Sequence, residues 1–240
     1  MIYFVLPVRN RRGEVVEVLR RLAETHPPLF VIVVDDGSSD GTSQEVEAFA
    51  GLRGRLRLLQ HVRSHGLGRA VTAGLRQAVA QSREASDVVL VAALPVPPDG
   101  EFLRPALALL EDGADMVVAS RFVPGALLPG GPGSRLLARL GSLLLRVLFP
   151  VPGLTDYTSL YRACRLDILR RAYEVHGPRL ASRAGQEGLA ELTVRLARAG
   201  LRVREIPLTV LPADRASFWS RFGPGALWRY ARMVAGLLRG

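Results

Sequence analysis

The chain has 240 residues, of which 48% are apolar and 6% aromatic, and its formal net charge is +10. This length and apolar content suffice for one large buried core, with or without an appended C-terminal segment. A single cysteine, Cys164, excludes an internal disulfide framework and a multi-cysteine metal site, and we expect a small buried thiol. The positive charge, carried by arginine, favours anionic partners such as nucleotide phosphates, anionic lipid or nucleic acid; a GC-rich genome would also produce it.

No apolar run reaches the roughly 18 residues that a membrane-spanning helix needs. The chain opens directly on an apolar run, Ile2–Val8, without a basic leader. We therefore expect no signal peptide and a cytoplasmic protein.

The first half alternates short apolar segments, typical of buried strands, with segments of helical amphipathic spacing. The expected strands are Ile2–Val8, Leu29–Val34, Arg55–Gln60 (an edge strand), Asp87–Ala93 and Asp115–Ser120, and the expected helices are Glu14–Ala23, Thr42–Ala50, Leu67–Gln81 and Glu101–Leu110. Ser39 or Asp40 is expected to cap the second of these helices. The alternation predicts an α/β fold, a mostly parallel sheet with helices on both faces, whose ligands bind beyond the carboxyl ends of the strands.

The pattern changes after Arg121. A Pro- and Gly-rich loop leads into an expected helix, Ser134–Phe149, with a broad leucine-rich face, and the tail from Phe218 to Leu238 mixes aromatic residues with arginines. A further helix is expected at Gln186–Ala199 and a strand at Leu201–Leu211. The leucine-rich helix and the tail suggest attachment to a membrane surface, where arginines meet anionic headgroups and Leu and Trp enter the interface. Core packing is the alternative for the leucine-rich helix.

Two adjacent carboxylates close the second expected strand. In the segment Val33–Thr42, Asp35 and Asp36 stand where the backbone opens onto the ligand side of the sheet. One can accept a hydrogen bond from a base edge and the other from ribose hydroxyls, while the glycine that follows lets the chain turn closely past a ligand. The alternative is a strand-to-helix turn with an N-cap, which accounts for Asp40 and Thr42 but does not require the two earlier aspartates.

This motif and several others resemble those of the family 2 (GT-A) glycosyltransferases, and most closely those of the dolichol-phosphate mannose synthases and related polyprenyl-phosphate hexose transferases. The likeness covers about residues 2 to 216 and keeps the family's motif order. The matching segments are Leu6–Asn10, Val34–Thr42, His65–Ala70, Ala119–Gly125, Thr155–Ala163, Glu191 and Arg202–Pro207.

The resemblance implies transfer of a hexose from a UDP- or GDP-sugar to a polyprenyl phosphate, by a protein peripheral to the cytoplasmic face of the cell membrane. The implied nucleotide-sugar-binding residues are Pro7, Val8, Asn10, Asp35, Asp36, Gly37, Ser38, Gly66, Leu67 and Gly68. The implied catalytic residues are Arg121, Asp156, Arg162, Glu191 and Arg215, with Arg121 and Arg162 facing phosphate groups. The alternative for each arginine is a solvated surface side chain, and for Glu191 an exposed helix residue.

One family motif is missing. Family members place Asp-x-Asp after the fourth strand to bind a divalent metal ion across the donor's diphosphate, whereas Val89–Pro98 contains neither aspartate. Alanine, leucine and proline cannot coordinate Mg²⁺ or Mn²⁺, so no metal or other cofactor is expected. The acidic residue usual after Asn10 is also replaced, by Arg11. Arg121, Arg162 and Arg215 could replace the metal as a cationic clamp, or a distant residue could supply the ligand. The remaining alternative is a catalytically degenerate member that binds a nucleotide or lipid, or serves as a partner subunit.

We expect residues 1–216 to form the GT-A-like domain and residues 217–240 an amphipathic tail at the membrane interface, with a membrane-protein partner as a further option. A dinucleotide-dependent oxidoreductase is disfavoured, because Gly-x-Gly-x-x-Gly does not follow the first strand. No nucleic-acid partner is expected, since no recognised binding motif is present.

Overall fold

The structure is a computed structural model that describes residues 1–25, 28–94, 96, 101–127, 132–177, 180, 183–185, 187–197, 200–209 and 224–239. Within these ranges, the side chains of 132–135, 137, 224–227 and 239 are not described. Arg215, one of the expected catalytic residues, and Asp99 lie outside the described residues.

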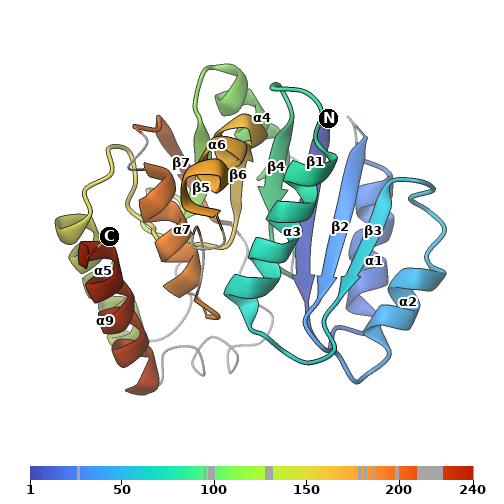
Figure 1. The fold of residues 1–240 in the computed structure, drawn as a ribbon, viewed down its shortest axis with the longest axis horizontal. Helices are drawn as coiled ribbons and strands as arrows, with labels where there is room; N and C mark the ends of the chain where they lie inside the picture. Colours follow the sequence, from blue (N-terminus) through green and yellow to red (C-terminus); the bar gives the residue numbers. More distant parts are fainter. Residues whose placement is uncertain are drawn as a thin grey trace.

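A seven-stranded sheet forms the centre of the molecule, in the spatial order β3-β2-β1-β4-β6-β5-β7 (Figure 1). The strands are β1 (Ile2–Val8), β2 (Leu29–Asp35), β3 (Leu56–Gln60), β4 (Val88–Val91), β5 (Met116–Ser120), β6 (Arg162–Arg165) and β7 (Val203–Pro207). Only β6 runs antiparallel to its neighbours among these strands, β4 on one side and β5 on the other. The expected α/β fold with a mostly parallel sheet is therefore confirmed, with β3 at the expected edge.

Helices cover both faces of the sheet and pack two apolar clusters against it. They are α1 (Glu14–Ala23), α2 (Thr42–Ala48), α3 (Leu67–Gln81), α4 (Leu103–Glu111), α5 (Pro132–Leu148), α6 (Leu166–His176), α7 (Glu187–Ala197) and α9 (Pro224–Arg239). One cluster joins the sheet to α1, α2 and α4, and the other joins it to α3, α6 and α7. In Figure 1, α3 and α7 lie in front of the sheet, and α5 and α9 lie together beyond β7. No helix in the described ranges is both long and apolar enough to cross a bilayer.

The C-terminal helix packs against the rest of the chain. Met233 and Leu237 of α9 are buried in the same cluster as α3, α6 and α7. Because Met233 and Leu237 are four residues apart, they lie on the same side of α9, and this side faces the protein interior. The proposed division at residue 216 stays a prediction, since residues 210–223 are outside the description.

Three of the described elements were absent from the sequence prediction, namely β6, α6 and α9, whose segment was expected only as an amphipathic tail. The four-residue β6 begins and ends with arginine and has no alternating apolar pattern, so its pairing with β4 and β5 is decided by the sheet. Helix α6 follows β6 without an intervening loop, as Arg165 ends the strand and occupies the helix N-cap position. Elsewhere the expected elements are present with ends that differ by a few residues. Gly41, rather than Ser39 or Asp40, occupies the N-cap position of α2, although Asp40 does accept a hydrogen bond from the Thr42 N–H.

Candidate active site

A cavity of about 600 Å³ opens at the carboxyl ends of β1 and β2. Five of the expected nucleotide-sugar-binding residues line it, namely Pro7, Val8, Asp36, Gly66 and Leu67. Pro7 and Val8 end β1, Asp36 follows β2, and Gly66 and Leu67 begin α3. Parallel strands that end at one edge bring these distant segments together, which is the usual position for a ligand in an open α/β sheet.

The Asp36 carboxylate is buried and accepts four hydrogen bonds from the segment that follows β3. His61 Nδ1 lies 2.8 Å from Oδ1, the Ser64 hydroxyl donates to Oδ2 at 2.7 Å, and the backbone N–H groups of His65 and Gly66 donate at 2.8 Å each. Burial opposes ionisation, but these hydrogen bonds outweigh it and lower the pKa of Asp36. The carboxylate is therefore ionised at neutral pH and holds the loop that forms one wall of the cavity.

Asp35 is fully buried and is not among the residues that line the cavity. Its Oδ1 accepts from the backbone N–H of Ser38 at 2.9 Å and from the Ser38 hydroxyl, and its Oδ2 accepts from the Ser43 hydroxyl. The described contacts of Asp35 thus stabilise its own loop, and its role in binding a nucleotide stays a prediction.

Asn10, Gly37 and Ser38 also lie outside the cavity lining and join two loops. Asn10 N–H donates to the Ser38 hydroxyl at 2.9 Å, and Asn10 Oδ1 accepts from Ser39 N–H at 3.0 Å. Gly37 has φ 72°, and a Cβ on it would lie 2.7 Å from the Arg63 carbonyl carbon and the Ser64 nitrogen. Only glycine permits this approach, so these residues hold the loops after β1, β2 and β3 against one another.

Gly66 and Gly68 pack the start of α3 against residues 183–185. The N–H of Gly68 donates to Ala184 O at 2.7 Å, and a Cβ on Gly68 would lie 2.4 Å from Arg183 O. A Cβ on Gly66, which has φ 92°, would lie 2.5 Å from Ala184 O. Gly66 still borders the cavity, whereas the contacts of Gly68 are made with the protein backbone.

Three arginines that sequence reasoning missed also line this cavity, Arg9, Arg11 and Arg229. Arg9 Nη1 donates to the Ser64 hydroxyl at 3.0 Å, which in turn donates to Asp36. Arg9 and Arg11 flank the expected Asn10, so their position beside the motif was a usable signal. Arg229 comes from α9, and no sequence signal placed a residue of that helix in this cavity.

The wall of this cavity includes the place where the family's metal-binding motif would stand. Ala93 and Leu94, directly after β4, line the cavity with alkyl side chains. Within the described ranges, no three His, Cys, Asp or Glu residues form a group that could hold a metal ion. Asp36, the acidic residue in the lining, already accepts four hydrogen bonds. The described residues therefore do not fit a divalent cation, which prefers several free oxygen ligands.

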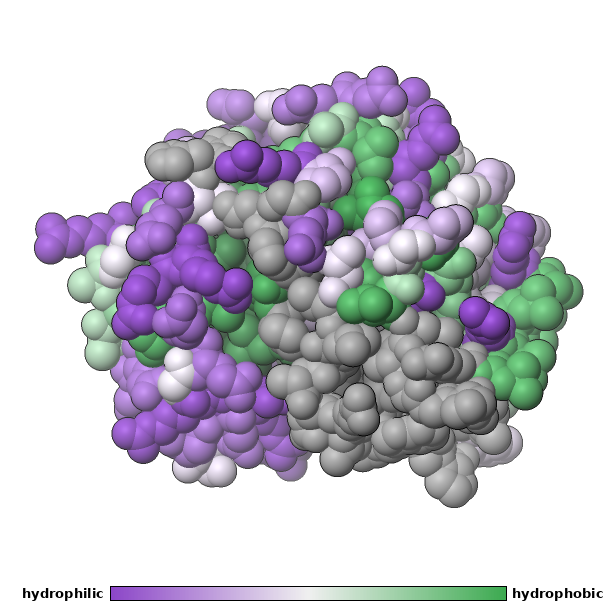
Figure 2. Space-filling view, turned by 180° about the vertical axis from the view of Figure 1, so that it is seen from behind, coloured by the Kyte–Doolittle hydropathy of each residue, from purple (hydrophilic) through white to green (hydrophobic). Residues whose placement is uncertain are grey.

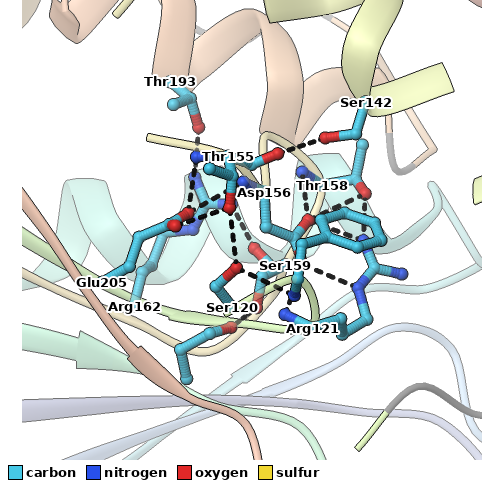
Figure 3. A network of polar contacts seen from close by, with 12 residues as sticks. Ser120, Arg121, Ser142, Thr155, Asp156, Thr158, Ser159, Arg162, Thr193 and Glu205 are labelled. Carbon is cyan, nitrogen blue, oxygen red and sulfur yellow. Dashed lines mark hydrogen bonds and ion pairs between the residues drawn. The ribbon is translucent and has the colours of Figure 1, made fainter. Parts of the chain in front are cut away.

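Arg121 and Asp156, both expected to be catalytic, form a buried ion pair after β5 (Figure 3). Arg121 Nε donates to Oδ2 at 2.7 Å and Nη2 to Oδ1 at 2.6 Å, the two-pronged geometry that suits a guanidinium and a carboxylate. Burial disfavours both charges, but the attraction between them prevails, so that the pKa of Asp156 is lowered and that of Arg121 is raised. Arg121 also donates to the Thr158 hydroxyl.

Glu205 of β7 holds the loop that carries Asp156. Its Oε1 accepts from the N–H groups of Thr155 and Asp156 at 2.7 and 2.8 Å, and its Oε2 accepts from the Thr155 hydroxyl at 2.6 Å. The Ser142 hydroxyl of α5 donates to the Thr155 carbonyl, so this loop joins β7 to α5 (Figure 3). Glu205 lies in the family-like segment Arg202–Pro207, whose residue pattern did not indicate this contact.

Arg162 is buried at the start of β6. Its Nη1 donates to the Thr193 hydroxyl at 2.6 Å, and its Nη2 donates to the Ser159 carbonyl. Burial lowers the pKa of Arg162 to about 10, so the guanidinium remains charged at neutral pH. The described contacts tie β6 to α7, and a phosphate-facing role for Arg162 stays a prediction.

Glu191 lies on α7 and is buried rather than exposed. Its Oε1 accepts from Arg195 Nη2 at 3.1 Å and its Oε2 from the Arg183 N–H at 3.2 Å. Glu191 therefore holds the 183–185 segment that contacts Gly66 and Gly68, and its catalytic role stays a prediction.

A second cavity, an apolar groove of about 590 Å³, runs between α5 and α9. Arg121 and Thr158 provide polar lining, and most of the rest is aliphatic, including Leu145, Val234 and Leu238. Tyr230 of α9 also lines the groove, and its hydroxyl is buried with no hydrogen-bond partner among the described residues. Burial raises the pKa of Tyr230, so this hydroxyl stays protonated and can donate.

Helix α5 presents leucines to the outside of the molecule. Its exposed apolar residues are Leu136, Leu140, Leu143, Leu144, Val147 and Leu148, at 37–69% exposure. In the view from behind, hydrophobic surface gathers at the edge of the molecule where α5 and α9 lie (Figure 2). Core packing, the alternative considered for this helix, therefore does not account for these six residues.

Comparison with known proteins decides the family. A model described as glycosyl transferase family 2 matches residues 3–127, more than half of the chain. The chain belongs to glycosyl transferase family 2. The resemblance inferred from the motifs is thereby confirmed.

Among curated relatives of this family 2 chain, an undecaprenyl-phosphate mannosyltransferase of Micrococcus luteus is 32% identical over 88% of this chain and 83% of its own length. A polyprenol monophosphomannose synthase of Mycolicibacterium smegmatis is 29% identical over 85% of this chain and 75% of its own. A solved mannosyltransferase from Pyrobaculum calidifontis, in complex with GDP-Man and Mn²⁺, aligns with a TM-score of 0.58 at 19% identity over 91% of this chain and 59% of that one. At that identity the structural likeness supports the fold.

Proposed function

We propose that this chain transfers a hexose from a nucleotide sugar to a polyprenyl phosphate. The observation that carries the proposal is a pair of cavities of opposite chemistry that share one helix. Arg229 of α9 lines the arginine-containing cavity at the sheet edge, and the next residue, Tyr230, lines the apolar groove. The curated relatives, which include an undecaprenyl-phosphate mannosyltransferase, support this pairing of a polar donor with a lipid acceptor.

The donor nucleotide would occupy the cavity at the carboxyl ends of β1 and β2. Pro7, Val8 and Leu67 offer apolar contacts to a base or ribose, and the ionised Asp36 fixes the facing loop. A nucleoside diphosphate is anionic, and the arginines of the same lining supply the complementary charge. GDP- and UDP-sugars are both candidates for this donor.

The acceptor's isoprenoid chain would lie in the groove between α5 and α9, with its phosphate toward Arg121, Thr158 and Tyr230. The unpartnered Tyr230 hydroxyl would gain a phosphate oxygen as acceptor, which removes the cost of a buried polar group without a hydrogen bond. The pair with Asp156 keeps Arg121 oriented and charged.

The chemistry needs little proton transfer. A phosphate monoester has a second pKa of about 6, so at neutral pH its oxygen is already anionic and can attack the sugar's C1 without a general base. The bond from C1 to the donor's phosphate oxygen breaks, and the nucleoside diphosphate leaves with the bonding electrons. The protein's tasks are then to bring the two substrates together, to exclude water and to stabilise the leaving diphosphate.

The exposed leucines of α5 would place this groove at a membrane surface. Arg139 and Arg146 of the same helix are also exposed and would meet anionic headgroups. Attachment through this face would make the chain peripheral, with the acceptor entering the groove from the lipid.

A transfer assay tests the proposal. GDP-mannose, UDP-glucose and UDP-N-acetylglucosamine are offered with undecaprenyl phosphate in anionic vesicles, with and without EDTA. We expect transfer of one of these sugars to the lipid. Nucleotide binding without transfer from any donor would instead support the non-catalytic alternative, and absence of both binding and transfer would refute the donor site.

A further inference from the structure

The donor cavity has a surplus of positive charge. Its described lining contains Arg9, Arg11 and Arg229, against one acidic residue, Asp36. The carboxylate of Asp36 already accepts hydrogen bonds from four donors of the protein. Because a cluster of cationic side chains favours an anionic ligand, this lining suits a diphosphate better than it suits a metal ion.

Two of the three arginines first considered as a replacement for the metal make other contacts, and the third, Arg215, lies outside the described residues. Arg121 holds Asp156 with two hydrogen bonds and lines the apolar groove, and Arg162 donates to Ser159 and Thr193 in the core. Neither is part of the donor cavity's lining. Among the described residues, the positive charge in the cavity lining that includes Ala93 and Leu94 therefore comes from Arg9, Arg11 and Arg229.

Arg229 is held in a way that leaves most of its guanidinium available. Its Nε lies 3.6 Å from Oε2 of Glu187, a buried carboxylate at the start of α7. Glu187 Oε1 accepts from the N–H of Gly185, another residue of the cavity lining. The Arg229 side chain is 48% exposed, and its two terminal nitrogens make no hydrogen bond within the described part of the chain. Those nitrogens are the pair that can bind two phosphate oxygens at once.

We propose that Arg229, together with Arg9 and Arg11, binds the diphosphate of the donor in place of a divalent metal ion, so that α9 completes the nucleotide site. This inference rests on the proposed function. Helix α9 would then contribute to both sites, through Arg229 in the donor cavity and through Tyr230 in the groove. A bound nucleoside diphosphate would draw Arg229 into the cavity, and because Tyr230 is the next residue, it would order the adjacent stretch of the acceptor groove.

The test is calorimetric binding of GDP, UDP and the corresponding monophosphates to the full chain, in EDTA and in Mn²⁺. We expect Arg229→Gln to weaken nucleoside diphosphate binding by about tenfold or more, since a charged hydrogen-bonding group is lost, and to affect the monophosphates less. Arg229→Lys keeps the positive charge but loses the paired N–H donors of the guanidinium. Its affinity for nucleoside diphosphates should therefore lie between those of the wild type and Arg229→Gln. Arg232→Gln, an exposed charge change on the same helix, serves as the matched control and should lie within about twofold of the wild type.

The outcomes separate this inference from the proposed function. If the wild type binds GDP or UDP equally well in EDTA and in Mn²⁺ while Arg229→Gln is weakened, the inference stands. If the wild type binds GDP or UDP but Arg229→Gln binds it as tightly as Arg232→Gln does, the inference is overturned and the proposed function survives. The same holds if nucleotide binding requires Mn²⁺. If the wild type binds neither nucleotide, both are overturned. Thermal unfolding of each variant shows that a loss of binding is not a loss of the fold.

Discussion

The two cavities differ in how they are built, although their volumes are nearly equal at about 600 and 590 Å³. The donor cavity is formed mainly by strand ends and loops, and its arginines have few partners. The apolar groove lies mainly between two helices, and Arg121, the arginine in its described lining, is paired with Asp156. The arginines of the donor cavity are therefore available to a ligand, whereas Arg121 beside the groove mainly stabilises the protein through Asp156.

The largest change in stability is expected at the buried ion pair of Arg121 and Asp156. Asp156→Leu leaves the buried guanidinium of Arg121 without its carboxylate, which should lower the free energy of unfolding by about 3–5 kcal/mol. Urea denaturation measures this loss. The double variant Arg121→Met/Asp156→Leu removes both charges and should be less destabilised than the single variant. A single variant as stable as the wild type would show that the pair is not structural.

A smaller loss of stability is expected for a change at Asp36, in the lining of the donor cavity. Asp36→Asn places an amide NH₂ toward some of the four donors that now face a carboxylate, and should cost about 1.5–3 kcal/mol of stability. Asp112→Asn, at an exposed position after α4, is the control and should be near neutral. Equal stability of the two variants in urea would contradict the role given to Asp36.

The same carboxylate predicts a dependence on pH. Its pKa in the folded chain lies below the ordinary value of 3.8, so its ionised form stabilises the fold at higher pH. This contribution is lost as the pH falls from about 4 through the lowered pKa. The acid limb of the stability curve should therefore be shallower for Asp36→Asn than for the wild type, as measured by urea denaturation at each pH.

A bulky side chain in the apolar groove should weaken use of the lipid acceptor without changing nucleotide binding. Ala235→Trp adds an indole to the groove lining and should raise the KM for undecaprenyl phosphate about tenfold, or about 1.4 kcal/mol, with GDP and UDP affinity unchanged. Val147→Trp lies on α5 outside the groove lining and serves as the control. A groove variant that lost nucleotide affinity but kept its lipid KM would reverse the assignment of the cavities.

The smallest effect is expected on the outer face of α5. Leu143 is 55% exposed, and Leu143→Ser should lower partition into anionic vesicles by about fivefold, because part of the leucine's transfer free energy of 1.5–3 kcal/mol is lost. Val175→Ser, at an apolar position on α6 that is 77% exposed, should leave the partition coefficient unchanged. A vesicle sedimentation assay compares them, and equal partition of both variants would remove α5 from the membrane contact.

Much of the N-terminal half was predictable because its signals are local. Helices α1 and α3 have the predicted bounds, since their apolar spacing and flanking turns lie within one short segment. The same holds for the strand ends that place Pro7, Val8 and Asp36 at one edge of the sheet. For Asp35 the sequence did not indicate its hydrogen bonds to Ser38 and Ser43, and its role in nucleotide binding stays a prediction.

By itself, the sequence determined the α/β class, the family and the edge of the sheet at which the donor cavity opens, since strand alternation and contiguous motifs are properties of neighbouring residues. The tertiary structure decided that Arg229 joins the donor cavity, that α5 and α9 enclose an apolar groove and that Arg121 is locked to Asp156. Those facts depend on contacts between residues far apart in the chain. Such contacts are chosen by packing and charge pairing in the folded state, which no local pattern of residues records.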